Sequence, residues 1–182
     1  QVGAFPGCSF GVHLNLTDFR PLTGPEKLQR ILDGDGGFAG DRIFRGTAVD
    51  STLAQGIFEE FCAQIAKLGS LGVNVSHIDS HHHIHTIPRV FPVLKRVQKR
   101  FQIRRVRISR NIYAKHESVS RVLLVKKALY NLLLRHYYRT RTTQGFADFR
   151  AFYACGTSNG IKHRTVEAMV HPAHRDCADE ES

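Results

Sequence analysis

The 182 residues, of which 42% are hydrophobic and 23% charged, match the size and composition of one soluble globular domain with a substantial core. This composition excludes a disordered chain. No run of 18 apolar residues occurs, which excludes a membrane-spanning helix, so we expect no membrane partner. The four cysteines lie far apart, in neither CxxC nor disulfide-framework spacing, which favours a reduced, cytoplasmic protein.

Positive charge is concentrated in the middle of the chain. The net charge is +10, and residues 89–141 contain 16 Lys or Arg against one acid, Glu117. Such a segment is typical of a nucleic-acid surface, an anionic-substrate site or a solvated face. Because the basic residues are dispersed and lack interleaved aromatic residues, we favour the solvated face. A basic nucleic-acid-binding module remains an alternative.

The first third of the chain predicts a strand, a long loop and a helix. Residues 10–17, FGVHLNLT, alternate between apolar and polar side chains, which is typical of a strand with one buried face. Residues 18–50 are rich in Gly, Pro and Asp and predict a long loop with one helical turn. Residues 52–68 have apolar side chains three and four positions apart, which predicts an amphipathic helix that ends at Gly69 and Gly72.

Strands and helices continue to alternate after this helix. The predicted elements are an extended segment at 73–85, a helix that Pro88 opens, a strand at 103–108, a helix at 118–138, a loop at 139–164 and a strand at 166–170. The helix at 118–138 is apolar over most of its circumference, so we expect it to be buried or to cover another surface. The alternation is typical of an α/β fold with a parallel sheet, and we expect a single domain over residues 1–182.

The segment SHIDSHHHIHTIP, residues 76–88, carries the strongest functional signal. If it is extended, every second side chain faces the same way, which places His77, Asp79, His81, His83 and His85 on one face. Burying five ionisable groups without partners costs free energy. A metal ion in a polar cleft would be one such partner. A His-rich tract that binds metal incidentally is the alternative.

Two further histidines belong to other predicted strands. His13 lies on the polar face of the strand at 10–17, and His171 directly follows the last strand. Ligands of parallel α/β folds bind beyond the carboxyl ends of the strands. We therefore expect His13, His171 and the cluster at 77–85 to meet at one site.

Five motifs follow one another along the chain: FGVHLNLT with Pro21, GDGGF at 34–38, HIDSHHHIHTIP, RVRI at 105–108 and VEAMVHP at 166–172. Over nearly the whole chain their succession resembles that of the YdjC/ChbG-like carbohydrate (chitooligosaccharide) deacetylases. The motif HxDxHxHxHxxP is specific to this family. The other motifs would be weak evidence alone, and their order along the chain strengthens them.

The resemblance implies a distorted (β/α) barrel, TIM-barrel-like and polysaccharide-deacetylase-like, which in this chain is incomplete at the N-terminus. It implies a hydrolase that removes the acetyl group from amino sugars such as N-acetylglucosamine oligosaccharides, with one divalent metal ion, Mg²⁺ or Zn²⁺, held by an aspartate and two histidines. Carried over to this sequence, the metal-binding histidines are His13 and His81, with His85 and His83 ranked below His81. A homodimer is compatible with the resemblance.

This chain departs from the family at its beginning. Family members open with a strand ending in Asp-Asp-Phe-Gly, which supplies a general base and the carboxylate ligand, and nothing like it precedes His13. We therefore expect residues 1–182 to bind metal weakly and to deacetylate very slowly or not at all. A catalytically inactive metal- or carbohydrate-binding family member is the first alternative.

Amide hydrolysis needs a nucleophilic water, a base, stabilisation of the oxyanion and an acid for the leaving amine. We expect His171 to be the general acid and Asp79 to be a catalytic residue that orients its neighbours, a role that His83 could share. Arg107, Asn15 and His83 are candidates for substrate binding. For Arg107 an exposed charge on a sheet edge is the alternative.

Overall fold

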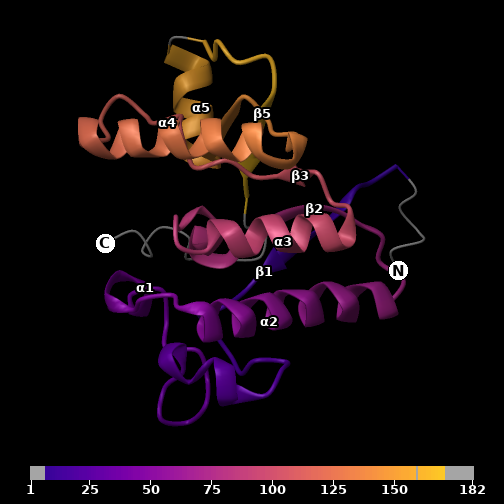
Figure 1. Cartoon of the computed structure of the whole chain (residues 1–182). Helices are drawn as coiled ribbons and strands as arrows, with labels where there is room; N and C mark the ends of the chain where they lie inside the picture. Colours follow the sequence, from indigo (N-terminus) through magenta and orange to yellow (C-terminus); the bar gives the residue numbers. More distant parts are fainter. Residues whose placement is uncertain (1–6, 159, 171–182) are drawn as a thin grey trace. The chain divides into compact units, whose positions relative to one another are not determined.

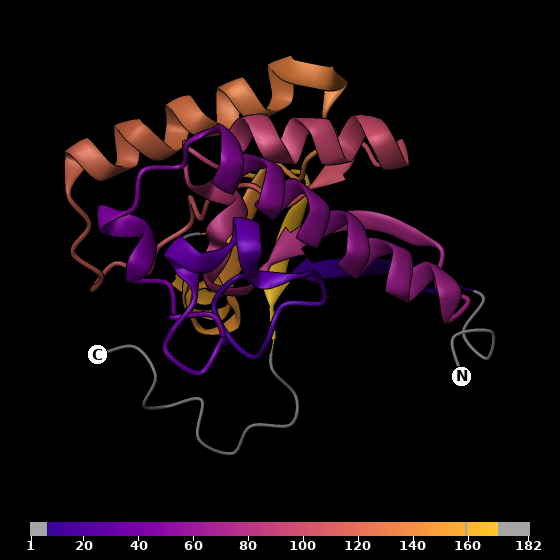
Figure 2. The ribbon, with the colours of Figure 1, turned by 60° about the horizontal axis from the view of Figure 1, so that its bottom comes forward.

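The computed structural model describes residues 7–158 and 160–170, in which helices combine with parallel strands (Figures 1 and 2). The chain divides into two compact units. The first comprises Gln1–Arg107 with Leu132–Thr142, and the second Ile108–Asn131 with Thr143–Ser182. The predicted α/β class with parallel strands is confirmed. The barrel is not confirmed, because the described strands form two small, open sheets of three and two strands.

The elements of the two units follow in chain order. The first unit contains β1 (Phe10–Leu14), the 3₁₀ turns η2 (Pro25–Lys27) and η3 (Gln29–Ile31), α1 (Ile43–Gly46), α2 (Ser51–Ser70), β2 (Val75–Ser80), the 3₁₀ segment η4 (His81–Thr86), α3 (Phe91–Phe101) and β3 (Arg105–Val106). Helix α4 (Arg121–His136) begins in the second unit and ends in the first, where η5 (Tyr137–Arg139) follows it. The second unit also contains β4 (Gly145–Asp148), α5 (Phe149–Ser158) and β5 (Val166–Met169).

Helix α2 packs its predicted apolar face into the core of the first unit. It lies beside α3 (Figure 1) and also contacts β1 and β2. The side chains spaced at three and four positions are buried as expected, namely Leu53, Ile57, Phe61 and Ile65. Asp50 caps the helix by accepting a hydrogen bond from the Leu53 backbone N–H at 2.9 Å. Gly69 remains inside the helix, and the turn comes at Gly72, whose φ of 82° suits glycine.

The predicted long loop at 18–50 is held against α2, beside which it lies in Figures 1 and 2. Glu60 of α2 is buried and accepts hydrogen bonds from the backbone N–H groups of Leu22 and Thr23. Gly56 allows the close approach of η2, because a Cβ atom there would lie 2.9 Å from the Lys27 carbonyl oxygen. The loop is therefore fixed at two points of the helix, which positions the residues at its start.

The prediction of an unstructured loop at 139–164 is wrong. This stretch contains β4 and α5. Strand β4 pairs in parallel with β5, in a register that runs from Gly145 beside Val166 to Asp148 beside Met169. A four-residue strand has too short a pattern to be recognised locally, and only its pairing with β5 defines it.

Helix α4 is covered on one face only. Its residues Tyr130 and Leu134 are buried, whereas apolar side chains elsewhere on the helix are more than half exposed among the described residues, namely Val122, Val125, Leu129 and Leu132. Of the two expectations for this helix, burial therefore holds for one face only, and the covering of another surface by the exposed side chains remains a prediction. No helix in the described part of the chain combines the length and apolarity that a bilayer crossing requires.

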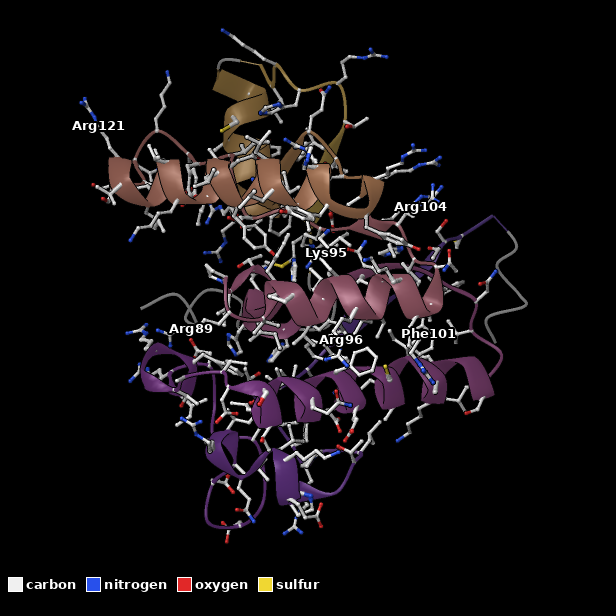
Figure 3. All side chains as sticks on the ribbon, viewed as in Figure 1. Arg89, Lys95, Arg96, Phe101, Arg104 and Arg121 are labelled. Carbon is white, nitrogen blue, oxygen red and sulfur yellow. The ribbon has the colours of Figure 1, made fainter. Side chains whose placement is uncertain are left out.

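Lys95 caps the carboxyl end of α4 from within α3 (Figure 3). Its buried ammonium donates hydrogen bonds to the carbonyl oxygens of Leu134 at 3.0 Å and Tyr137 at 3.2 Å, and to the Thr140 hydroxyl at 2.8 Å. A cation suits this position because helix carbonyls lack partners there. Burial lowers the pKa of Lys95 to about 8.

We expect Lys95→Met to lower the free energy of unfolding at pH 7 by about 1–3 kcal/mol, because buried carbonyl oxygens lose their donor. The folded-state pKa is about 8 and the ordinary value is 10.5, so between these pH values the folded chain binds fewer protons at Lys95 than the unfolded chain. The stability of the native protein relative to the variant should therefore rise from pH 8 to 10.5, by at most about 1.4 kcal/mol per pH unit. Urea denaturation of both proteins from pH 7 to 10 measures this difference. A constant difference would contradict the lowered pKa.

Candidate metal centre

Strands β1 and β2 bring two of the expected site residues side by side. The strands are parallel neighbours, and their register places His13 beside Asp79 and Leu14 beside Ser80. The His13 Nδ1 atom lies 3.0 Å from the Asp79 Oδ2 atom. The pair lies near the carboxyl ends of both strands, where ligands of parallel sheets bind.

The contact with Asp79 determines how His13 can react. With its Nδ1–H donated to the carboxylate, the half-exposed imidazole keeps the lone pair on Nε2 for another partner. Histidines that bind metals are commonly oriented by a carboxylate in this way. Arg107 also contacts Asp79, through an Nη1–Oδ2 distance of 2.6 Å. Burial would raise the pKa of Asp79, but the His13 hydrogen bond and the Arg107 charge outweigh it and hold that pKa below its ordinary value.

The histidine cluster does not continue β2. The strand ends at Ser80, and η4 follows with left-handed backbone at His82 (φ 45°) and His83 (φ 53°). The prediction that alternate residues up to His85 share one strand face is therefore wrong beyond Ser80. Two consecutive left-handed residues other than glycine store strain, which proteins tend to keep at functional sites.

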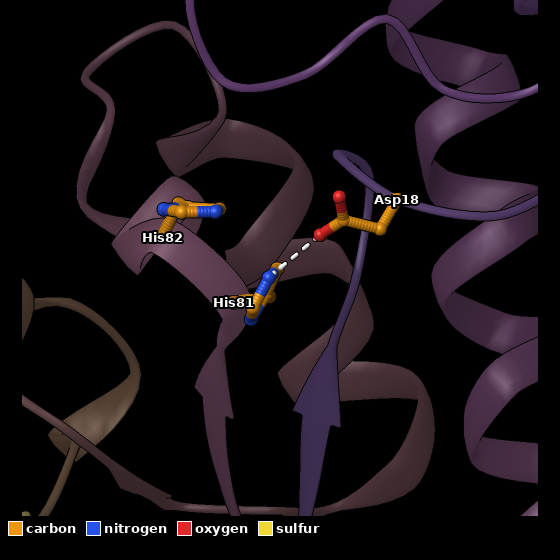
Figure 4. A group of neighbouring side chains, drawn as sticks. All are labelled: Asp18, His81 and His82. Atoms are coloured by element: carbon orange, nitrogen blue, oxygen red, sulfur yellow. Dashed lines mark ion pairs between the residues drawn. The ribbon is translucent and has the colours of Figure 1, made fainter. Parts of the chain in front are cut away.

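The turn directs His81 and His82 toward Asp18 (Figure 4). The His81 Nε2 atom lies 2.6 Å from the Asp18 Oδ2 atom, and one ligand atom from each of Asp18, His81 and His82 lies within 4.8 Å of the others. Burial lowers the pKa of His81, and the neighbouring His82 lowers it further. The neutral imidazole that results is the form that binds metal.

His13 lies beside this group. Its ring centroid is 5.6 Å from that of His81, and the two rings meet edge to face. The structure thus brings together His13 and His81, the two metal ligands expected from the sequence, and adds a carboxylate from the same unit. The side chains of His13, His81 and Asp18 are all between 41% and 50% exposed, so a ligand can reach them.

Asp18 was missed by the sequence analysis, which counted it as the first residue of a loop. The Asn15 side chain fixes it: Asn15 Oδ1 accepts the backbone N–H groups of Thr17 and Asp18, and Asn15 Nδ2 donates to the Asp18 carbonyl at 2.8 Å. The only sequence signal was a carboxylate a few residues after a strand that carries a candidate ligand. The hydrogen bonds of Asn15 give it a positioning role, and its expected contact with substrate remains a prediction.

His85 is directed into the core. Its backbone N–H and its Nδ1 atom both bond to the Ser80 hydroxyl, and its Nε2 atom lies 3.0 Å from the Arg107 carbonyl oxygen. Complete burial lowers the pKa of His85 to about 3, so the ring is neutral and acts as a structural link between β2 and the residue after β3. This placement removes His85 from the candidate ligands.

The other expected residues have different positions. Arg107 is 12% exposed and paired with Asp79, so the alternative of an exposed edge charge is wrong. His83 lies partly buried in η4, where its carbonyl accepts a hydrogen bond from the Thr86 hydroxyl. His171 lies outside the described residues.

Comparisons with known proteins show what the chain is similar to. The family model described as "YdjC-like protein" matches residues 2–182. The chain is 36% identical over 101 residues to a carbohydrate deacetylase of Vibrio campbellii, a match that covers 54% of this chain and 37% of the relative. It is 37% identical over 107 residues to a carbohydrate deacetylase of Geobacillus stearothermophilus, covering 58% and 41%. The matched stretch thus spans about two fifths of the length of these curated relatives.

The fold also has a counterpart among solved structures. A protein of Enterococcus faecalis V583, described as a candidate for cellobiose-phosphate cleavage, superposes with a TM-score of 0.69. The sequences are 22% identical, and the match covers 93% of this chain and 62% of the other. At this identity the likeness concerns the fold alone.

Proposed function

Because the chain belongs to the YdjC-like family, we propose that it is part of a carbohydrate deacetylase that removes the acetyl group from N-acetylated amino sugars with one divalent metal ion. The observation that carries the proposal is the group of Asp18, His81 and His82 near the carboxyl ends of β1 and β2, with His13 beside His81. The name of the curated relatives supports the reaction class.

The donor atoms fit a divalent ion. Asp18 offers a carboxylate oxygen, His81 and His82 offer imidazole nitrogens, and His13 has Nε2 left after its bond to Asp79. Imidazole and carboxylate donors suit zinc better than magnesium, and they leave coordination positions for substrate and water. An ion held there would polarise the amide carbonyl and lower the pKa of a water molecule.

The surrounding residues support this chemistry by positioning. Asp79 fixes the tautomer and orientation of His13, and Arg107 keeps the Asp79 carboxylate ionised. The assignment of His171 as general acid near the leaving amine remains a prediction. Arg107 and His83 remain candidates for contact with a sugar hydroxyl of the substrate.

We expect the whole deacetylase of which this chain is part, supplied with Zn²⁺ or Mg²⁺, to release acetate from N-acetylglucosamine oligomers, and a chelator to abolish the release. The physical reason is that carbonyl polarisation and water activation depend on the ion. Coupled acetate detection measures the product, with His116→Ala as a control, because His116 is an exposed histidine outside the site.

Two other outcomes would contradict parts of this proposal. Acetate release that is indifferent to the chelator, or release of sugar units instead of acetate, would exclude the metal-dependent deacetylase. Stoichiometric metal binding without acetate release would favour the alternative of a non-catalytic metal or carbohydrate binder.

A further inference from the structure

A cavity at the amino ends of β2 and β3 is lined by arginines. Its volume is about 420 Å³, and its lining consists of Asn74–Ser76, Phe101–Arg105 and Arg141, all in the first unit. Figure 3 labels two of these residues, Phe101 at the end of α3 and Arg104 beyond it. Three of the lining residues are arginines, and none is acidic.

The charges of these three arginines are not compensated. Other arginines of the chain form ion pairs, such as Arg107 with Asp79 and Arg110 with Glu117. Within the described ranges no carboxylate lies at ion-pair distance from Arg104, Arg105 or Arg141. Three like charges around one cavity repel each other, so an anion bound among them would be stabilised.

Backbone pairing holds the arginines together. The Arg141 backbone N–H donates to the Arg104 carbonyl at 2.7 Å, and the Val106 N–H donates to the Arg141 carbonyl at 3.1 Å. Arg141 thus lies beside Arg105 as a parallel bridge partner at the edge of the sheet. The Arg104 guanidinium also lies 5.7 Å from the centroid of the Tyr138 ring. Because the backbone positions are fixed, only the side chains lose conformational freedom when the cavity binds a ligand.

We propose that this arginine cavity binds the phosphate group of a small phosphorylated molecule. Arginine is suited to this role because its planar fork donates two parallel hydrogen bonds to phosphate oxygens. The volume is within the range of roughly 300–1,000 Å³ typical of small-molecule sites, so it leaves room for more than a bare phosphate. The exposed amide of Asn74, which has no hydrogen bond within the described chain, is available to a hydroxyl group of the ligand.

The proposal does not depend on the deacetylase assignment. The cavity uses the first residues of β2, whereas the candidate metal centre uses Asp79 and the turn after Ser80. At about 3.3 Å per residue, the length of β2 separates the two sites by roughly 16 Å. Binding at one site can therefore be measured without disturbing the residues of the other.

The test is calorimetric titration of the full chain with glucose 6-phosphate and with inorganic phosphate, with glucose as the uncharged control. We expect glucose 6-phosphate to bind and glucose not to bind. Arg105→Gln and Arg141→Gln should each weaken binding by about tenfold or more, because each removes charged hydrogen bonds to the phosphate. Arg141→Lys should retain part of the affinity, since it keeps the charge and loses the fork.

Arg121→Gln is the matched control, because it removes the same charge from an exposed position on α4, outside the cavity (Figure 3). An equal loss of affinity in Arg121→Gln would show that net charge alone attracts phosphate, and would overturn the proposal. So would the absence of glucose 6-phosphate binding at millimolar concentration. A single-stranded oligonucleotide that binds more tightly than glucose 6-phosphate, and is weakened by the same variants, would instead assign the arginines to a polynucleotide surface.

Discussion

Replacing His81 by alanine is expected to weaken the binding of a divalent metal ion by at least about 100-fold. Losing a residue that only orients a ligand lowers metal affinity by roughly 10- to 100-fold, and losing the ligand itself should lower it further. His81 is central to the group, with Asp18 at 2.6 Å, the His82 ring at 4.3 Å and the His13 ring at 5.6 Å. Calorimetric titration with Zn²⁺ measures the change, and His116→Ala should leave the affinity unaltered.

Variants of the neighbours show which donors complete the site. His13→Ala should lower metal affinity about as much as His81→Ala. Asp79→Asn should lower it by about 10- to 100-fold, because His13 remains and loses only the partner that orients its ring. Asp18→Asn should also weaken binding, since it removes the only carboxylate of the group within the described residues. Unchanged affinity in both histidine variants would exclude His13 and His81 as ligands.

Removing the Arg107 guanidinium is expected to lower the free energy of unfolding by about 3–5 kcal/mol, because it leaves the Asp79 carboxylate largely buried without its cation. The side chains of Arg107 and Asp79 are 12% and 13% exposed, and the Nη1–Oδ2 distance is 2.6 Å. Arg107→Met keeps the length of the side chain and removes the charge. Urea denaturation of the native chain and the variant at pH 7 measures the loss.

The exposed pair of Arg30 and Asp50 provides the control. Its N–O distance is 2.7 Å, but both side chains are half exposed, so solvent screens the pair and Arg30→Met should leave the free energy of unfolding nearly unchanged. A double variant, Arg107→Met with Asp79→Leu, should recover most of the stability, because no buried charge is then left unpaired. Equal losses in the two arginine variants would mean that solvent reaches the Arg107 pair as readily as the surface pair.

The sequence predicted well those features that depend on periodicity. Alternation of side chains located β1, and apolar spacing located α2 with the correct buried face, because burial of one face leaves a regular pattern in the chain. The motif at 76–88 identified His81 and Asp79, and the strand at 10–17 identified His13. The expectation that residues from both strands converge rested on the general position of ligands in parallel sheets, and the β1–β2 register brings them together.

Only the tertiary structure decided the positions of the side chains within the cluster. From the sequence alone, the chain could have continued as an extended strand to His85. Instead it turns at His82 and His83, and contacts with Ser80 and Arg107 hold His85 in the core. Asp18 enters the site because Asn15 and the attachment of its loop to α2 position it, and such contacts between distant segments leave no local pattern. For the same reason β4 was missed, since a strand of four residues is defined by its partner β5 rather than by its own side chains.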